Sequence, residues 1–338
     1  MNNLKFDFND ISIIPTMLSD ISSRDEINVY DKNNKLPLWV SPMDTVVSKD
    51  NHKLFLDLGY NVCLPRGEKY SEDKCFISYG LDEIIKRVEN NEKLSSLINI
   101  DIANGNMIKL YNISKVIKEK YDVQLMVGNI ANPKTYEKLS EIGVDYIRCG
   151  IGGGSICTTA ANVGIFYPMA SLIKECYDIS CTLNNSAKII ADGGFKNFDE
   201  IIKALAIGAD GVMLGGILSK CIESCAPCYM KDDYQGYKEI SYKKGINIFK
   251  NKDEDLYKQY RGSSIKSVQK KWNKNKIKTG EGIIKFNEVE YTLQGWTENF
   301  IDYLKSNMSY CGKRNLEEYI GYPEYVFISQ NSFKRFYK

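Results

Sequence analysis

The stretch from Gly150 to Thr159, GIGGGSICTT, places four glycines directly before a cysteine, Cys157. Glycines in such a loop let backbone amides approach a phosphate or a flat ring closely. The pattern therefore indicates a reaction that uses a phosphate-binding turn and a thiol only a few residues apart. Taken alone, the stretch is better explained as a flexible loop that ends in a small, inert cysteine. The rest of the chain must show whether this stretch is a functional site or an ordinary loop.

The chain contains a single histidine, His52, in the helix-like stretch SKDNHKLFLDLGY. Histidine is the usual general base and metal ligand, but here we expect a residue on a helix surface. The chemistry must then depend on Cys, Thr, Asp, Glu, Lys, Arg or Tyr. This excludes Ser-His-Asp hydrolases, Cys-His hydrolases and most zinc enzymes.

The composition is that of a globular protein: of 338 residues, 43% are hydrophobic and 26% charged, with a formal net charge of +2. This balance gives no reason to expect nucleic acid or a membrane surface as a partner. No apolar run is long enough to cross a bilayer, and the polar start MNNLKFDFND is not a signal peptide. We therefore expect a cytoplasmic protein whose ten cysteines are mostly reduced.

Short apolar runs recur along the first two thirds of the chain, and helix-like segments such as 132–143 and 198–209 separate several of them. Runs of this kind are typical of strands buried on both faces of a parallel sheet. Eight such units predict an α/β fold, a (β/α)8 TIM barrel, with a doubly wound open sheet as the alternative. No strand is followed by the G-x-G-x-x-G turn that the alternative would favour. The eight predicted strands are 37–41, 60–65, 75–80, 97–105, 123–129, 144–152, 188–194 and 211–216.

The pattern ends after residue 217, in a polar stretch rich in Lys, Tyr and Asp that continues to about 285. A run of this length without clear elements is either a mobile functional flap or a disordered insertion. We expect a mobile flap within a single catalytic domain, 1–338, and a closing helical segment, 291–322, that packs against the barrel.

Polar and glycine residues gather after the predicted strands, where the active site of a barrel enzyme lies. The loops after the seventh and eighth strands carry glycine pairs that make a natural phosphate cradle. Any one of these loops could be an ordinary turn, but six of them at one end of a barrel favour a site. They contain Ser41 to Asp44, Asp101 with Asn104, Asn129, Cys157, Asp192 to Gly194, and Gly215 with Gly216.

With these motifs in order, the sequence resembles the IMP dehydrogenase/GMP reductase family. The matching pieces span residues 6 to about 285, and the cysteine loop is the most specific of them. They are FDFNDISIIP, SRDEINV, SPMDTV, IDIANG, VGNI, GIGGGSICTT, IIADGGF, GADGVMLGG, YRGSS and EGIIKF. The resemblance implies a barrel that binds a purine nucleotide and a nicotinamide cofactor, and a cysteine that attacks C2 of the purine. This role for the cysteine is chemically reasonable, because a thiol in a glycine-lined turn should ionise easily and add to an electron-poor carbon.

The resemblance also implies a role for individual residues. Catalysis would fall to Cys157, Thr159 and Glu281. Substrate binding would fall to Met43, Ser155, Asp192, Gly193, Gly194, Gly215, Gly216, Tyr260, Ser263 and Ser264. Cofactor binding would fall to Asp101, Asn104, Asn129 and Lys278. No metal is expected beyond a monovalent cation at Gly150, Gly152 and Cys157.

Of the family's two reactions, the sequence favours the NADPH-dependent reductive deamination of GMP to IMP and ammonia. The dehydrogenases use an Arg-Tyr pair on the flap to activate water, and no such pair occurs between 217 and 285. Thr159 and Glu281 instead fill the reductase roles, and the chain has no room for an inserted regulatory domain. The resemblance further implies a homotetramer. The alternatives are oxidation of IMP with NAD to XMP, and a purine-nucleotide-binding paralogue with altered chemistry.

Several positions depart from the family pattern at the base or cofactor: Pro42, Pro65, Gly153, Ala160 and Ser263. They leave the nucleophile and the phosphate site intact. A separate motif, Cys221-x3-Cys225-x2-Cys228, has the spacing of a radical-SAM iron–sulfur site. Such a site normally lies near the start of a barrel, whereas this motif follows the last strand. We therefore expect no iron–sulfur cluster, and keep a cluster or a zinc site as the alternative.

Overall fold

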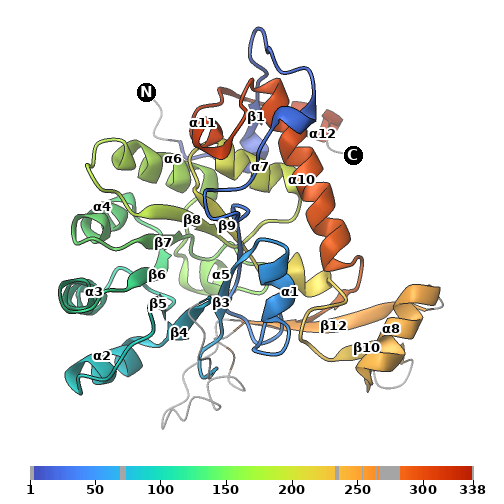
Figure 1. Cartoon of the computed structure of the whole chain (residues 1–338). Helices are drawn as coiled ribbons and strands as arrows, with labels where there is room; N and C mark the ends of the chain where they lie inside the picture. The colour runs from blue at the N-terminus through green and yellow to red at the C-terminus, as the bar shows by residue number, and fades with distance from the viewer. Residues whose placement is uncertain are drawn as a thin grey trace.

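A computed structural model describes residues 4–68, 74–232, 236–252, 254–262, 265 and 282–336. Eight parallel strands close into a barrel, because the first strand pairs with both the second and the last. This confirms the predicted (β/α)8 fold (Figure 1). The strands are β2 (Leu38–Val40), β3 (Asn61–Leu64), β4 (Phe76–Tyr79), β5 (Leu97–Asp101), β6 (Gln124–Ile130), β7 (Tyr146–Cys149), β8 (Lys188–Asp192) and β9 (Gly211–Leu214).

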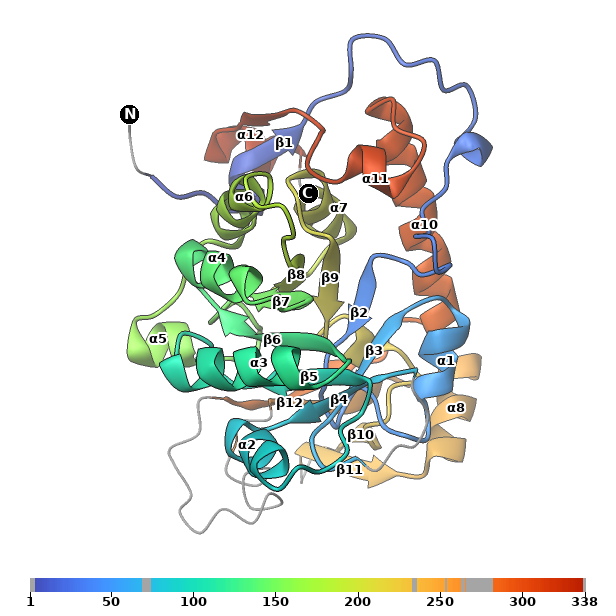
Figure 2. The same cartoon turned by 60° about the vertical axis from the view of Figure 1, so that its left-hand side comes forward.

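Helices surround the barrel and follow most of its strands (Figures 1 and 2). The segment predicted at 132–143 forms α4, where Asn132 caps the helix by accepting a hydrogen bond from the amide of Lys134 at 2.9 Å. The described residues between β3 and β4 contain no helix. The helices up to β9 are α1 (His52–Asp57), α2 (Leu81–Glu89), α3 (Ile108–Lys120), α4 (Pro133–Glu141), α5 (Thr159–Val163), α6 (Met169–Ser180) and α7 (Phe198–Ala206).

Two packing layers fix the barrel. Side chains inside it form a cluster of Trp39, Cys63, Phe76, Met126, Ile190 and Met213. The outer faces of the strands and the inner faces of the helices make the main core. Because both faces of each strand are buried, the strand sequences are almost continuously apolar, which is why they could be recognised.

The segment predicted as a flap without clear elements contains ordered structure in its described part. Four antiparallel strands form a sheet in the order β11-β10-β12-β13, and α8 packs against β10 and β12. In Figure 1 this unit projects from the barrel beside α1. It consists of β10 (Cys228–Asp232), β11 (Gly236–Ile240), α8 (Tyr242–Asn251), β12 (Leu256–Arg261) and β13 (Ile284–Glu288). The prediction of an element-free segment is therefore wrong for these residues.

The ends of the chain meet on the opposite side of the molecule. β1 (Ile11–Ile13) pairs antiparallel with β14 (Tyr325–Phe327). The predicted closing helical segment is a long helix and a short one, α10 (Leu293–Tyr310) and α11 (Leu316–Tyr319). The remaining elements are α12 (Gln330–Phe336) and the 3-10 helices η1 (Phe8–Asp10), η2 (Arg24–Glu26) and η3 (Leu218–Lys220). No helix in the described ranges is long and apolar enough to span a bilayer.

Candidate active site

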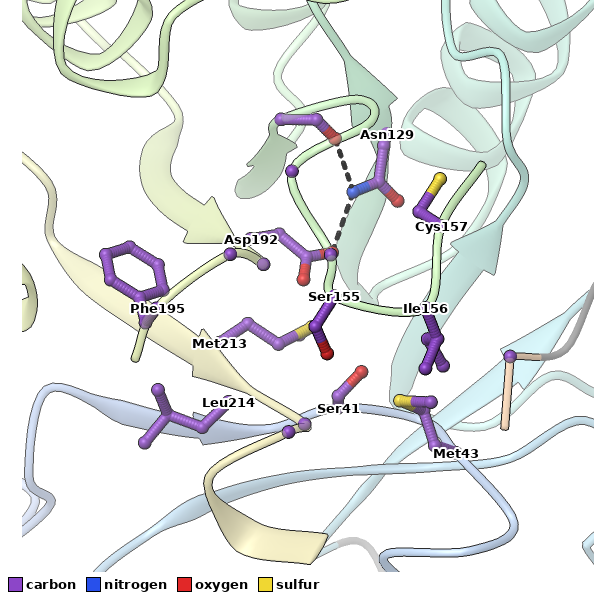
Figure 3. A pocket seen from close by; sticks show the side chains of 18 of the residues that line it. Ser41, Met43, Asn129, Ser155, Ile156, Cys157, Asp192, Phe195, Met213 and Leu214 are labelled. Carbon is purple, nitrogen blue, oxygen red and sulfur yellow. Dashed lines mark hydrogen bonds between the residues drawn. The ribbon is translucent and has the colours of Figure 1, made fainter. Parts of the chain in front are cut away.

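A cavity of about 220 Å³ lies at the carboxyl ends of the barrel strands (Figure 3). Its walls come from the loops after β2, β5, β7, β8 and β9, and from the ends of β6 and β12. This is the end at which barrel enzymes carry their active sites. The glycine loop after β7 forms one wall, and Asp192, Gly193 and Gly194 after β8 form another.

Cys157 lies in the glycine loop, just before α5. Its amide donates a hydrogen bond to the carbonyl of Gly154 at 2.9 Å, which closes a turn and holds the thiol at the cavity. The thiol lies 3.2 Å from the hydroxyl oxygen of Thr159 and makes a hydrogen bond with it. The half-buried sulfur therefore has a hydroxyl partner that could carry a proton during a reaction at this thiol.

The flap sheet returns to the barrel directly at this cysteine. Gly282 forms an antiparallel bridge with Cys157, and the amide of Ile283 donates to the carbonyl of Ile156 at 3.1 Å. The predicted catalytic residue Glu281, which precedes Gly282 in the sequence, lies outside the described residues. So do the predicted site residues Ser263, Ser264 and Lys278.

Glycines shape the part of the cavity in which a phosphate was predicted. Gly194 has a φ of +90°, and a Cβ there would lie 2.9 Å from the carbonyl oxygen of Gly153. A Cβ on Gly215 would lie 2.8 Å from the hydroxyl of Tyr260. Side chains at these positions would clash with the walls, so the cradle needs glycine. Ser155 and Gly216 complete the lining on this side.

Tyr260 reaches the cavity from β12 and is 4% exposed. Its hydroxyl donates to the sulfur of Met43 at 3.5 Å. Burial raises the pKa of the Tyr260 phenol, and the charge of Asp192 adds to this. The phenol therefore stays protonated near neutral pH and can donate a hydrogen bond to an anion.

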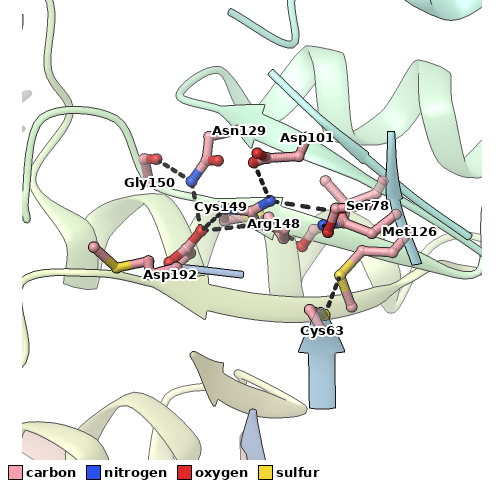
Figure 4. Close-up of polar contacts among 12 residues, drawn as sticks. Cys63, Ser78, Asp101, Met126, Asn129, Arg148, Cys149, Gly150 and Asp192 are labelled. Atoms are coloured by element: carbon pink, nitrogen blue, oxygen red, sulfur yellow. Dashed lines mark hydrogen bonds and ion pairs between the residues drawn. The ribbon is translucent and has the colours of Figure 1, made fainter. Parts of the chain in front are cut away.

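A buried charge network, centred on Arg148 near the end of β7, lies in the wall of the cavity (Figure 4). Its guanidinium lies 2.8 Å from the carboxylate of Asp192 and 2.7 Å from that of Asp101. Asn129 donates to Asp192 at 2.7 Å, and the guanidinium of Arg66 lies 3.4 Å from the second oxygen of Asp101. Burial alone would raise the pKa of Asp101, but the charges of Arg148 and Arg66 outweigh it and lower this pKa. The charges of the two arginines thus favour the ionised form of Asp101, while Arg148 and Asn129 fix the orientation of the Asp192 carboxylate.

Arg148 was not among the residues predicted for the site. The sequence signal was an arginine inside an otherwise apolar run, VDYIRCGIG. Its partners lie 47 and 44 residues away in the chain, so only the closed barrel brings them together. Asp101, Asn129 and Asp192, which were predicted, all line the cavity.

Most of the predicted site residues within the described ranges lie at this one cavity, and Asn104 is the exception. Asn104 is exposed, and its side chain accepts a hydrogen bond from the amide of Asn106 at 3.0 Å. The residues proposed for a monovalent cation, Gly150, Gly152 and Cys157, line the cavity. The carbonyl of Gly150 accepts a hydrogen bond from Asn129 at 2.9 Å. The predicted residues that line the cavity are Met43, Asp101, Asn129, Gly150, Gly152, Ser155, Cys157, Thr159, Asp192, Gly193, Gly194, Gly215, Gly216 and Tyr260.

An ion pair joins the loop after β2 to the flap sheet. Arg261 at the end of β12 lies 2.8 Å from the carboxylate of Asp44. Arg261 is the only arginine between residues 217 and 285. Its guanidinium therefore holds the loop of Pro42 and Met43 against the sheet, next to the cavity.

The placement of His52 corrects the prediction of a surface residue. His52 is the first residue of α1 and is 3% exposed. Its Nδ1 lies 2.7 Å from the carbonyl oxygen of Lys49. Phe55, three positions further on, is also buried, so His52 belongs to the buried face of the helix, and it does not line the cavity.

The three cysteines of the CIESCAPC motif lie near the base of the flap sheet. Cys221 and Cys228 are buried, and the thiol of Cys225 donates to the carbonyl of Asp44 at 3.4 Å. Burial raises the pKa of all three thiols, that of Cys225 to about 12. In the described ranges no group of three or more His, Cys, Asp or Glu side chains could hold a metal. The geometry therefore gives the cluster alternative no support.

Comparison with known proteins agrees with this geometry. The model of the IMP dehydrogenase / GMP reductase domain matches residues 78–335. The chain belongs to the IMP dehydrogenase/GMP reductase family. The family is one of oxidoreductases, and it uses nicotinamide cofactors. The resemblance drawn from the cysteine loop is thereby confirmed.

Relatives within the family carry both names. The chain is 30% identical to an inosine-5'-monophosphate dehydrogenase of Cryptosporidium parvum, over 75% of this chain and 60% of that protein. It is 27% identical to GMP reductase 1 of Mus musculus, over 97% of this chain and 96% of that protein. It is 24% identical to a GMP reductase of Caenorhabditis elegans, over 98% and 94%. The chain thus spans less than two thirds of the dehydrogenase but nearly all of each reductase.

Proposed function

We propose that this member of the family is a GMP reductase, which converts GMP to IMP and ammonia with NADPH as the reductant. The observation that carries the proposal is the pair formed by Cys157 and Thr159, 3.2 Å apart at the glycine-lined cavity. This pair joins a nucleophile to a hydroxyl proton carrier, which a reaction that expels ammonia needs.

The described residues offer a complementary surface for each part of a purine nucleotide. Backbone amides around Gly194 and Gly216, with the hydroxyls of Ser155 and Tyr260, suit the phosphate. Asp192, oriented by Arg148, suits the ribose hydroxyls. The base would then lie between Met43 and Cys157, with its C2 atom facing the sulfur.

The reaction can be written from the residues at the cavity. The thiolate of Cys157 adds to C2 of the purine, and the exocyclic amine takes a proton and leaves as ammonia. Thr159, with Glu281 from the flap, would relay that proton. A bound nicotinamide cofactor would supply a hydride to C2, after which the carbon–sulfur bond breaks and returns the electron pair to Cys157. The cofactor would lie next to Asp101 and Asn129, with Lys278 as a further contact.

Two observations favour the reductase direction over oxidation of IMP. The single arginine of the flap segment, Arg261, is held by Asp44 at 2.8 Å, so it is not placed to activate water beside Cys157. The reductase relatives named above are covered over 94% and 96% of their length, against 60% for the Cryptosporidium parvum dehydrogenase. The same proposal includes NADPH as the cofactor, a cytoplasmic location and a homotetramer. Light scattering would test whether the protein is a tetramer.

The experiment is to identify the product formed from each nucleotide. Purified protein is incubated with GMP and NADPH, and separately with IMP and NAD, and the nucleotides are separated by chromatography. The proposal predicts IMP from the first mixture. XMP from the second would support the dehydrogenase alternative, and no product from either would support a binding paralogue with altered chemistry.

A further inference from the structure

Residues 5–10 form an arm that crosses the barrel surface beside α6 and α7 (Figures 1 and 2). The amide of Phe6 donates to the hydroxyl of Ser171 on α6 at 2.7 Å, and the amide of Ser171 donates to the carbonyl of Phe6 at 3.1 Å. The ammonium of Lys203 on α7 donates to the carbonyl of Phe8 at 3.0 Å. Among the described residues that line the active-site cavity, none belongs to this arm.

The proposed phosphate cradle has few side chains of its own to hold it in place. Gly193 and Gly194 have φ values of +93° and +90°. A Cβ on Gly194 would lie 2.9 Å from the carbonyl oxygen of Gly153, so the loops after β7 and β8 lie backbone against backbone. Glycine loses more conformational freedom on ordering than any other residue. Neighbouring groups must therefore fix these loops if they are to be ordered before a ligand binds.

The arm fixes the loop after β8 through a pair of aromatic rings. Phe195 directly follows Gly194 and lines the cavity (Figure 3). Its ring centroid lies 5.5 Å from that of Phe8, and both side chains are buried. The bond from Lys203 to the carbonyl of Phe8 ties the arm to α7, the helix that follows this loop. Phe8 thus limits the movement of Phe195, and with it that of the glycine pair that precedes Phe195.

The arm also supports the cysteine loop, through the start of α6. The carboxylate of Asp7 accepts hydrogen bonds from the amides of Met169 and Ala170, each at 3.4 Å. A negative group at this position stabilises the amino end of a helix. Met169 is buried, and its side chain lies so close to Gly150 that a Cβ there would clash with it. Asp7 therefore holds the residue that packs against the first glycine of the cysteine loop.

We propose that the arm is a positioning element of the nucleotide site. Phe8, through Phe195, and Asp7, through Met169, hold the two glycine loops in the conformation that receives a phosphate group. The loops are then ordered when the chain folds and not when the ligand binds, which raises the affinity for the phosphate. This inference rests on the phosphate cradle of the proposed function, but it applies to any purine nucleoside monophosphate and does not depend on the reaction.

The test compares the affinities of the full-length protein for IMP and for inosine, which lacks the phosphate, by calorimetric titration. Phe8→Leu keeps an apolar side chain but loses the ring contact, so IMP should bind about fivefold more weakly, the equivalent of one aromatic pair. The affinity for inosine should not change. Phe55→Leu is the matched control, because Phe55 is buried, is paired with the ring of Tyr60 and does not line the cavity. It should leave both affinities unchanged.

A double-mutant cycle tests the route by which Phe8 acts. In a Phe195→Leu background, Phe8→Leu should cause no further loss of IMP affinity, because its effect passes through that ring. Asp7→Asn removes the negative charge at the start of α6 and should weaken IMP binding about threefold, again without an effect on inosine. Asp7 is exposed, so this variant tests the arm without a change in the core.

Equal losses of affinity for IMP and inosine would overturn the proposal, since Phe8 and Asp7 would then only support the fold. An unchanged affinity for IMP in both Phe8→Leu and Asp7→Asn would overturn it as well. Fully additive losses in the double mutant would show that Phe8 does not act through Phe195. The identity of the reaction product is a separate readout: XMP formed from IMP would refute the reductase assignment without altering these affinity ratios. Circular dichroism shows whether each variant folds.

Discussion

Arg148 lies 2.8 Å from Asp192 and holds its carboxylate at the wall of the cavity. Both side chains are at most 10% exposed, and the same guanidinium also pairs with Asp101. One arginine therefore links the carboxylate proposed to bind the ribose with a carboxylate proposed to lie beside the cofactor. The fork of the guanidinium allows this double contact, which a single ammonium could not reproduce.

We predict that Arg148→Lys keeps the charge but loosens Asp192. The KM for the nucleotide should rise about tenfold, the value of one lost hydrogen bond between charged groups, while kcat changes less. Steady-state kinetics with the nucleotide varied would measure this. Arg87→Lys, at a more exposed arginine paired with Glu92, is the matched control and should have no effect. An unchanged KM in Arg148→Lys would show that Arg148 only supports the barrel.

For Cys157, we predict that Cys157→Ala abolishes turnover but leaves nucleotide binding nearly intact. The proposed phosphate cradle consists of Ser155, Gly194 and Gly216, so it does not include the thiol. Loss of a true nucleophile should lower kcat by several powers of ten, on the order of 10⁴-fold or more. Calorimetric titration measures binding, and Cys181→Ala, at an exposed cysteine, is the control. Turnover within tenfold of wild type would rule out the covalent mechanism.

The proposed proton relay predicts a selective effect at Glu281. Glu281→Gln keeps the size of the side chain but removes its ionisable group, so GMP deamination should slow by about 10²- to 10⁴-fold. Binding of IMP, and any partial reaction between IMP and oxidised cofactor, should change much less. Rapid-mixing measurements of both half-reactions separate the steps. An equal loss in both would mean that Glu281 acts only on the position of the flap.

A buried lysine in the flap sheet predicts how stability depends on pH. Lys258 is 0% exposed, and its ammonium donates to the carbonyl of Ser224. Burial lowers the pKa of Lys258, and the nearby thiols of Cys228 and Cys225 offset only part of this. Between the lowered pKa and the ordinary value of about 10.4, the unfolded chain binds more protons than the folded one, so stability rises with pH in this window.

Lys258→Met removes this titration, so wild type should gain stability relative to the variant as the pH rises from 7 towards 10. Urea unfolding at a series of pH values gives the difference in the free energy of unfolding. Using the difference cancels the general effect of alkali on both proteins. A difference that stays flat over this range would show that the Lys258 ammonium is as well stabilised in the fold as in water.

The sequence predicted the barrel well because its strands are buried on both faces, so apolar runs such as 188–194 mark them directly. The flap sheet was missed for the opposite reason. Along β12, buried and half-buried residues alternate, but one buried position is Lys258, which breaks the apolar pattern. His52 was misplaced although Phe55 follows it at helical spacing, a signal that the histidine shares the buried face.

In the candidate site, too, some residues could be predicted from the sequence and others could not. Cys157, Ser155 and the glycines could be predicted, because they lie within one continuous motif whose chemistry is local. Arg148 could not be assigned a role, since its partners Asp101 and Asp192 become neighbours only when β5, β6, β7 and β8 pair in that order in the barrel.

The most direct test of the central claim follows absorbance at the nicotinamide band under two conditions. With GMP and NADPH, the account predicts a steady fall in absorbance that requires both substrates and disappears in Cys157→Ala. With IMP and NAD, it predicts no sustained rise. A continuous rise with IMP and NAD, and no fall with GMP and NADPH, would contradict the account and identify the protein as a dehydrogenase.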